Sequence, residues 1–312
     1  MTGLLNILKG PGVTSHGVIS RLRRLTKIKR IGHAGTLDPQ AAGVLPVCVG
    51  EATKMIPYLD HRRKIYRVEM KLGIVTDTQD MTGQILKTDL NIPGAEDVKK
   101  VLDTFHGEYW QVPPMYSAIK KQGKKLYELA RKGTVVEREP RLKMIYDLRW
   151  ISIVDDLVCF DVTCSEGTYV RSLCHDVGQI LGCGAVMSFL LRLESCCQPI
   201  AEAVTLEEME EDTCWERNLI SIDHALRHYP KVFVSESWRK RITNGLSAEC
   251  EAFANLEPVE TGEPELSQKA VHDSLVRVYL NDCFIGMGTM LTENNHVIMK
   301  KSLPTMAKIS NE

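Results

Sequence analysis

The sequence predicts a mixed α+β protein, with a largely antiparallel sheet flanked by helices and followed by a small β-rich module. Apolar and polar residues alternate over residues 65–72 and 157–164, which is typical of half-buried strands. Apolar residues recur at helical spacing over residues 95–105 and 173–181, which predicts helices that pack on such a sheet. Three short strand-like runs, at residues 276–280, 284–291 and 296–300, predict the C-terminal module.

Residue types at segment ends support two further helices. Thr14 and Ser15 can cap a helix whose apolar face contains Val18 and Leu22. Gly133 closes a predicted helix over residues 124–132.

Length and composition predict a folded protein of two parts. The 312 residues suit one large and one smaller domain, and we place the boundary so that residues 1–230 and 231–312 form them. No apolar run reaches membrane-span length, and the N-terminus shows no signal-peptide pattern. The ten cysteines include no CxxC pair, which favours a reduced, cytoplasmic protein.

Charge is distributed unevenly along the chain. Residues 1–200 hold 28 basic and 21 acidic residues, a net charge of +7, whereas the remaining 11 basic and 19 acidic residues give −8. Two basic clusters lie in the first part, at residues 21–30 and 120–132. This asymmetry predicts that the first part contacts a polyanion.

The most informative stretch is residues 32–47 (GHAGTLDPQAAGVLPV), interpreted as a flexible loop that presents the carboxylate of Asp38. Pro39 biases Asp38 towards an extended conformation. Gly35 and Gly43 let the backbone approach a ligand closely. Composition alone favours an ordinary turn here.

This stretch resembles the catalytic motif of the TruB-type tRNA pseudouridine synthases. Further motifs agree with that family in order and spacing over about residues 1–200, and the run 276–301 is similar to the family's PUA-like RNA-binding module. The matching motifs are residues 9–16, with Gly10 where a proline is usual, Tyr66 within residues 64–68, PPMYSAIK at 113–120, residues 123–133, GTYVR at 167–171, and Leu190.

The resemblance implies a pseudouridine synthase fold and three catalytic residues. Asp38 would be the nucleophile, and whether it attacks the ribose or the base stays open. Arg171 would pair with Asp38, stabilising and orienting its carboxylate. Tyr66 would stack on the target uracil, and its hydroxyl would serve in proton transfer.

The resemblance also implies a set of substrate-binding residues and an RNA-gripping insertion at about residues 110–140. His33 would occupy the space left by the extruded nucleotide, because the target base must leave its stack before it can react. Tyr169 and Leu190 would line the pocket of the target base. The other substrate-binding residues are Lys9, Arg62, Lys64 and Lys120.

The reaction breaks a C–N bond and makes a C–C bond between the same ribose and base. Nothing is oxidised, so we expect no cofactor and no metal. The expected partner is the T-arm stem-loop of tRNA, which would be modified at uridine 55. We expect the enzyme to be a monomer that needs no guide RNA and does not bind a membrane.

Four alternative functions are compared with this prediction. One is a tRNA-binding folding factor, and another is a synthase that acts on a different structured RNA. A third is a guide-RNA-dependent synthase, against which the insertion at residues 123–133 argues. A carboxylate glycosidase would normally need a second catalytic acid, and none stands in these motifs.

Overall fold

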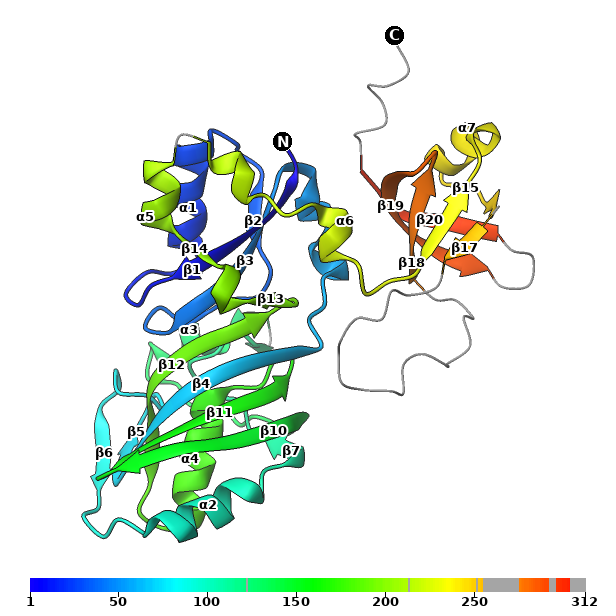
Figure 1. Ribbon diagram of the computed structural model, residues 1–312. Coiled ribbons are helices and arrows are strands. Elements are labelled where there is room, and N and C mark those ends of the chain that lie inside the picture. Colours follow the sequence, from blue (N-terminus) through cyan, green and yellow to red (C-terminus); the bar gives the residue numbers. More distant parts are fainter. Residues whose placement is uncertain (122, 213, 251, 255–274, 292–295, 304–312) are drawn as a thin grey trace.

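The computed structural model describes residues 1–121, 123–212, 214–250, 252–254, 275–291 and 296–303. Its largest element is a ten-stranded sheet in the order β14-β1-β3-β12-β4-β11-β10-β7, with β13 on β12 and β2 on β3 (Figure 1). The strands are β1 (Gly3–Lys9), β2 (Ile31–His33), β3 (Ala42–Val49), β4 (Arg63–Leu72), β7 (Gly107–Gln111), β10 (Arg141–Val154), β11 (Leu157–Ser165), β12 (Ala185–Ser195), β13 (Gln198–Pro199) and β14 (Val204–Thr205).

The predicted alternation holds in the central strand β4. Tyr66, Val68 and Met70 are buried on its inner face, whereas Arg67 and Glu69 point the other way. Its pairings with β11 and β12 are antiparallel, and the parallel pairs β1–β14 and β3–β12 make the sheet mixed. The predicted α+β class is confirmed.

Helices cover the sheet in two groups (Figure 1). The helices α2 (Ala95–Asp103) and α4 (Val170–Leu181) pack together beside β10 and β12. At the other end, α1 (Ser15–Thr26) packs beside α5 (Leu206–Glu211), and Thr14 caps α1 by accepting a hydrogen bond from the Gly17 amide at 2.9 Å. The helix predicted over residues 173–181 begins earlier, at Val170, and ends at Leu181 with Gly182 as its C-cap.

Several strands were not predicted from the sequence. The most important is β3, whose eight residues are all buried, so that its sequence shows no alternation. The prediction of a loop through residues 32–47 is therefore wrong at both ends, because Gly32 and His33 belong to β2 and the part from Ala42 onward is a central strand between β1 and β12.

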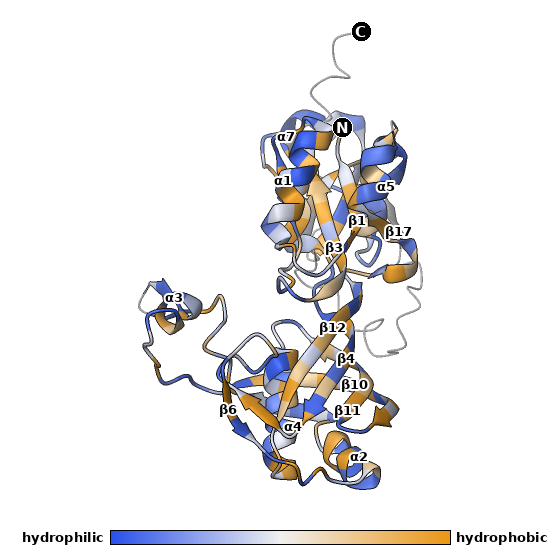
Figure 2. Ribbon diagram, turned by 90° about the vertical axis from the view of Figure 1, so that its left-hand side faces the viewer, coloured by the Kyte–Doolittle hydropathy of each residue, from blue (hydrophilic) through white to orange (hydrophobic). Residues whose placement is uncertain are grey.

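The insertion contains a lysine-rich hairpin, β8 (Lys120–Lys121) and β9 (Lys124–Lys125), and the short helix α3 (Leu126–Ala130). Figure 2 shows α3 standing away from the ten-stranded sheet. The helix predicted over residues 124–132 is thus shorter. A second hairpin, β5 (Ile74–Thr76) and β6 (Ile85–Thr88), lies beside β12.

The C-terminal strands form a separate six-stranded sheet, which includes the three predicted from the sequence. Arg277 joins it to the preceding segment, since its buried guanidinium donates to the Tyr229 carbonyl at 2.9 Å and pairs with Asp223 of α6 (Ile222–Ala225) at 3.0 Å. The strands are β15 (Lys231–Val234), β16 (Ala248–Glu249), β17 (Ala252–Ala254), β18 (Leu275–Leu280), β19 (Cys283–Leu291) and β20 (His296–Ser302).

Candidate active site

Four residues of the site stand side by side across four neighbouring strands. Lys9 of β1 is paired with Gly43 of β3, Gly43 with Arg192 of β12, and Arg192 with Tyr66 of β4. Gly43 has φ +114°, and a Cβ there would lie 2.2 Å from the Arg192 carbonyl oxygen. Only glycine therefore allows β3 and β12 to approach at this point.

Two buried cations hold the backbone around Asp38. The Arg192 guanidinium donates to the carbonyls of Val44 at 2.7 Å, Thr36 at 3.2 Å and Gly35 at 3.4 Å. The Lys9 ammonium donates to the carbonyls of Gly10, Val13 and Pro39 at 2.9, 2.7 and 3.1 Å. Both side chains are completely buried. Backbone carbonyls, rather than a carboxylate counter-ion, accept the hydrogen bonds that compensate for burying each charge.

Further bonds fix the same segment from the direction of α1. The Ser15 hydroxyl donates to the Leu37 carbonyl and accepts from the Leu37 amide, each at 3.0 Å. The Gly12 amide donates to the Pro39 carbonyl at 2.8 Å. Because Leu37 is itself buried, the loop of residues 34–41 is tied down on both sides of Asp38 rather than flexible as interpreted from its composition.

Asp38 and Arg171 form an ion pair. The Arg171 Nε lies 3.1 Å from Asp38 Oδ2, and the Asp38 side chain is 41% exposed whereas that of Arg171 is 7% exposed. A second carboxylate, Asp80, lies 3.8 Å from Arg171 Nη1, and the Tyr116 carbonyl accepts from Nη2 at 3.0 Å. Arg171 is thus a fixed cation that presents a carboxylate accessible to solvent.

Two tyrosines lie close enough to Asp38 to feel its charge. Burial raises the pKa of Tyr66 to about 12, and the neighbouring Arg192 cation acts in the opposite direction. Burial also raises the pKa of Tyr169, which feels both Arg171 and Asp38. Both phenols therefore keep their protons at neutral pH. Leu190, buried on β12, faces Val68 next to Tyr66 along the sheet.

His33 and Lys64 lie at the edge of this cluster. Burial lowers the pKa of His33, and the Arg192 cation lowers it further, so the imidazole is neutral near pH 7. Lys64 is buried, and its Cε would be 3.8 Å from a Cβ placed on Gly35. Burial likewise lowers its pKa, and Arg192 adds to the effect.

Three residues predicted to bind substrate make contacts away from the Asp38–Arg171 ion pair. Lys9 is behind the loop, where it bonds backbone carbonyls. Arg62 is exposed and pairs with Asp60 at 2.7 Å. Lys120 is exposed on the hairpin of the insertion, opposite Lys125. Their substrate-binding roles stay predictions.

The sequence interpretation missed Arg192, Asp80 and Gln111. Arg192 follows Leu190 at a spacing of two, so a cation on the inner face of a strand was a visible signal. Nothing in the sequence connects the turn that carries Asp80 with Arg171. The amide of the buried Gln111 donates to the Tyr169 carbonyl at 3.0 Å and accepts from the Tyr169 amide at 2.8 Å, a contact between distant segments.

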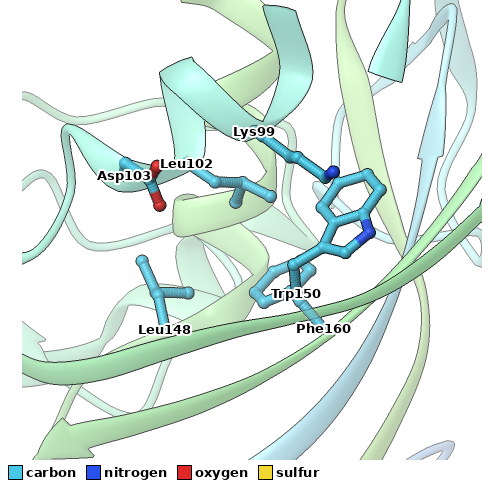
Figure 3. A pocket seen from close by; sticks show the side chains of 6 residues that line it. All are labelled: Lys99, Leu102, Asp103, Leu148, Trp150 and Phe160. Carbon is cyan, nitrogen blue, oxygen red and sulfur yellow. The ribbon is translucent and has the colours of Figure 1, made fainter. Parts of the chain in front are cut away.

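Two cavities differ in size and position. One, between α2 and β10, has a volume of about 20 Å³ and is lined by Leu102, Trp150 and Phe160 among others (Figure 3). It has room for about one water molecule and is a small packing gap between the helix and the sheet. The other, about 200 Å³, lies beside Tyr169.

The described residues contain no cluster of three or more His, Cys, Asp or Glu side chains arranged to hold a metal ion. Within the same residues, no helix is long and apolar enough to cross a membrane.

The fold, with an exposed aspartate held by a buried arginine at the centre of a mixed sheet, is that of a pseudouridine synthase. A solved Cbf5-Nop10-Gar1 complex contains a chain of the same fold, with a TM-score of 0.72 and 25% identity, covering 96% of this chain and 84% of that one. A structure of an H/ACA RNP bound to a substrate RNA gives a TM-score of 0.70 at 23% identity, over 96% and 84% of the two chains.

Sequence comparison narrows the class. Residues 23–170 match the model of the TruB family pseudouridylate synthase N-terminal domain, and residues 171–229 match the tRNA pseudouridylate synthase B C-terminal domain. A relative from Alkaliphilus oremlandii, named tRNA pseudouridine synthase B, is 44% identical over 95% of both chains. One of the same name from Clostridium kluyveri is 43% identical over 92% of this chain and 95% of its own. The chain belongs to the TruB family, and it is an isomerase.

Proposed function

We propose that this protein converts uridine 55 in the T-loop of tRNA into pseudouridine, with Asp38 as the nucleophile. The relatives named tRNA pseudouridine synthase B support tRNA as the substrate. The observation that carries the catalytic assignment is the Asp38–Arg171 ion pair, in which the carboxylate is accessible and the guanidinium is not.

The proposed chemistry needs a nucleophile that can bond and then leave. Asp38 forms a covalent bond to the flipped nucleotide, the glycosidic C–N bond breaks, and the uracil turns within the pocket. A C–C bond to the ribose then forms, Asp38 is released, and the base carbon loses a proton while the ring nitrogen freed from the ribose gains one. Arg171 fixes the carboxylate at the start and receives it again at the end.

Tyr66 and its neighbours act on the base. Tyr66 stays protonated, since its pKa is raised to about 12, so its hydroxyl can donate a hydrogen bond but is not a ready base. Its ring, with Tyr169 and Leu190, forms an aromatic and apolar wall for the uracil. His33, uncharged at neutral pH, fills the space that the nucleotide vacates in the RNA.

The remaining parts would hold the RNA. Lys120, Lys121, Lys124 and Lys125 stand on one hairpin, and none of the four has an ion-pair partner in the described part of the chain. Phosphates of the T-arm would supply the counter-charges. We assign residues 1–230 to catalysis and residues 231–312 to a PUA-like RNA-binding module, in a monomer that works in the cytoplasm without guide RNA.

One experiment tests this function. The purified protein is incubated with an unmodified tRNA transcript, and pseudouridine is mapped by carbodiimide labelling and primer extension, alongside the variant Asp38→Asn. A single new stop in the T-loop, absent with the variant while tRNA binding is kept, is the expected result. No stop with either protein, with tRNA still bound, would contradict the proposal and favour the folding factor.

A further inference from the structure

The cavity beside Tyr169 lies between the active site and the insertion. Pro113 and Ile119 contribute an apolar wall from the insertion, and Gly167 and Tyr169 come from the segment that leads into Arg171. Tyr169 stands two residues before Arg171, and the Arg171 guanidinium donates to the Tyr116 carbonyl of the insertion at 3.0 Å, so the cavity borders the place where the uridine would react.

Two cations line the cavity from one strand. Arg141 and Lys143 are two residues apart on β10, so their side chains project from the same face. Their cross-strand partners on β7 are Gln111 and Tyr109, both buried. On this face Lys143 is half-buried and Arg141 is exposed, whereas Leu142 and its partner Trp110 lie on the opposite, exposed face.

Neither cation has an ion-pair partner among the described residues. Lys143 donates to the Glu166 carbonyl at 2.9 Å, which leaves two of its three donors unused. Burial lowers the pKa of Lys143 and the nearby Arg141 lowers it further, while the charge of Glu166 acts in the opposite direction. Two like charges held beside a partly desolvated cavity favour an anion there.

The walls of the cavity are built to stay open. Gly167 has φ +72°, and a Cβ on it would lie 2.9 Å from the Lys143 ammonium, so a side chain there would displace the cation. The side-chain amide of Gln111 makes both of its hydrogen bonds to the Tyr169 backbone. Arg138 donates to the Pro113 carbonyl at 3.1 Å and fixes the opposite wall.

We infer that this cavity binds a phosphate of the RNA strand next to the reacting uridine, with Arg141 and Lys143 as its ligands and the attached ribose against Ile119 and Pro113. The inference rests on the proposed function and adds a subsite to it. A volume of about 200 Å³ is below the ~300–1,000 Å³ of pockets that enclose a whole small molecule, which suits one unit of a chain.

The test uses the whole protein and a T-arm stem-loop RNA in which each phosphate near the uridine is replaced in turn by a neutral methylphosphonate. One flanking linkage should lower kcat/KM of the wild type about tenfold, since a charge-assisted contact is lost. The variants Arg141→Gln and Lys143→Gln should lose a similar factor with normal RNA. They should lose almost nothing more when that same linkage is neutral.

Arg149→Gln is the matched control, because Arg149 stands on the same strand, does not line the cavity and pairs with Asp161 at 2.8 Å. It should keep the wild-type linkage profile. The logarithmic dependence of RNA affinity on salt should fall by about one unit of slope in each cavity variant and stay unchanged in the control.

The outcomes separate the two proposals. If the wild type modifies the T-loop but no flanking linkage is sensitive, or the cavity variants keep the same sensitive linkage, the subsite is wrong and the proposed function stands. The linkage scan of the wild type decides this even if a variant fails to fold. If the wild type forms no pseudouridine in the T-loop, both proposals fail.

Discussion

The Asp38 loop and the insertion are built in opposite ways. Arg192 and Lys9 are completely buried and donate three hydrogen bonds to carbonyls of residues 34–41, with three more to the adjoining backbone. In the insertion, Lys120, Lys121 and Lys124 are exposed, one bond from Arg138 to the Pro113 carbonyl joins its two ends, and the Tyr116 carbonyl accepts one bond from Arg171.

The difference matches two different tasks. A nucleophile must be placed to within a fraction of an ångström, so its loop is fixed before the substrate arrives. A segment that grips a folded RNA gains from adapting to it, and exposed lysines pay little desolvation until they meet a phosphate. The fixed backbone around Asp38 and the exposed lysines of the insertion therefore lie in separate parts of the same chain.

The largest expected effect on catalysis comes from removal of Arg171, the cation that presents the nucleophile. Arg171→Met should lower kcat about 10²–10³-fold, because a fixed charge at the reacting carboxylate is lost, with a much smaller change in KM. Single-turnover pseudouridine formation measures this effect. Arg67→Met removes an ion pair of similar length, 2.9 Å to Asp161, on the outer face of the sheet and should leave kcat unchanged. Equal losses in both variants would contradict the assignment.

The next test concerns the loop itself. Arg192→Met should lower the free energy of unfolding by about 3 kcal/mol, since three carbonyls lose a charged donor. Arg138→Met leaves one carbonyl without its donor and should cost about 1 kcal/mol. Urea unfolding of both variants measures the two losses in the free energy of unfolding. Similar losses would mean that the loop is no better fixed than the insertion.

The pH dependence of stability sharpens the account of Lys9. Burial lowers its pKa from 10.5 to about 8, with Asp38 opposing and Arg192 adding to this effect. Between these two pH values the unfolded chain binds more protons at this site, so the contribution of Lys9 to stability rises with pH. The melting temperature of the wild type minus that of Lys9→Met should thus be larger at pH 9.5 than at pH 7. A difference that shrinks would show that the charged form is the one favoured by folding.

The smallest expected effect on stability is in the insertion. Replacing Lys120 and Lys124 together by Gln should change the free energy of unfolding by less than about 0.5 kcal/mol. The salt dependence of tRNA binding should nevertheless lose about one unit of slope for each phosphate contact. Lys100→Gln, on the exposed side of α2, controls for general charge and should leave the slope unchanged. A double variant with the wild-type slope would place the RNA elsewhere.

By itself the sequence determined the α+β class, the C-terminal strands and the central strand β4, because alternation and helical spacing are local patterns. Its motif resemblance also identified the TruB family. It did not reveal β3, which is buried on both faces and lacks alternation, and it made a rigid loop look flexible.

The way in which the site is held depends on contacts between segments that are distant in the sequence. Arg192 reaches the carbonyls of the Asp38 loop because β12 pairs with β3, and Asp80 reaches Arg171 because the turn at residues 76–83 contacts α4. The same is true of the cavity, which needs β10, the insertion and the Gly167 segment together. A sequence pattern reports what each segment prefers locally, whereas the partners of a buried charge depend on which strands lie side by side.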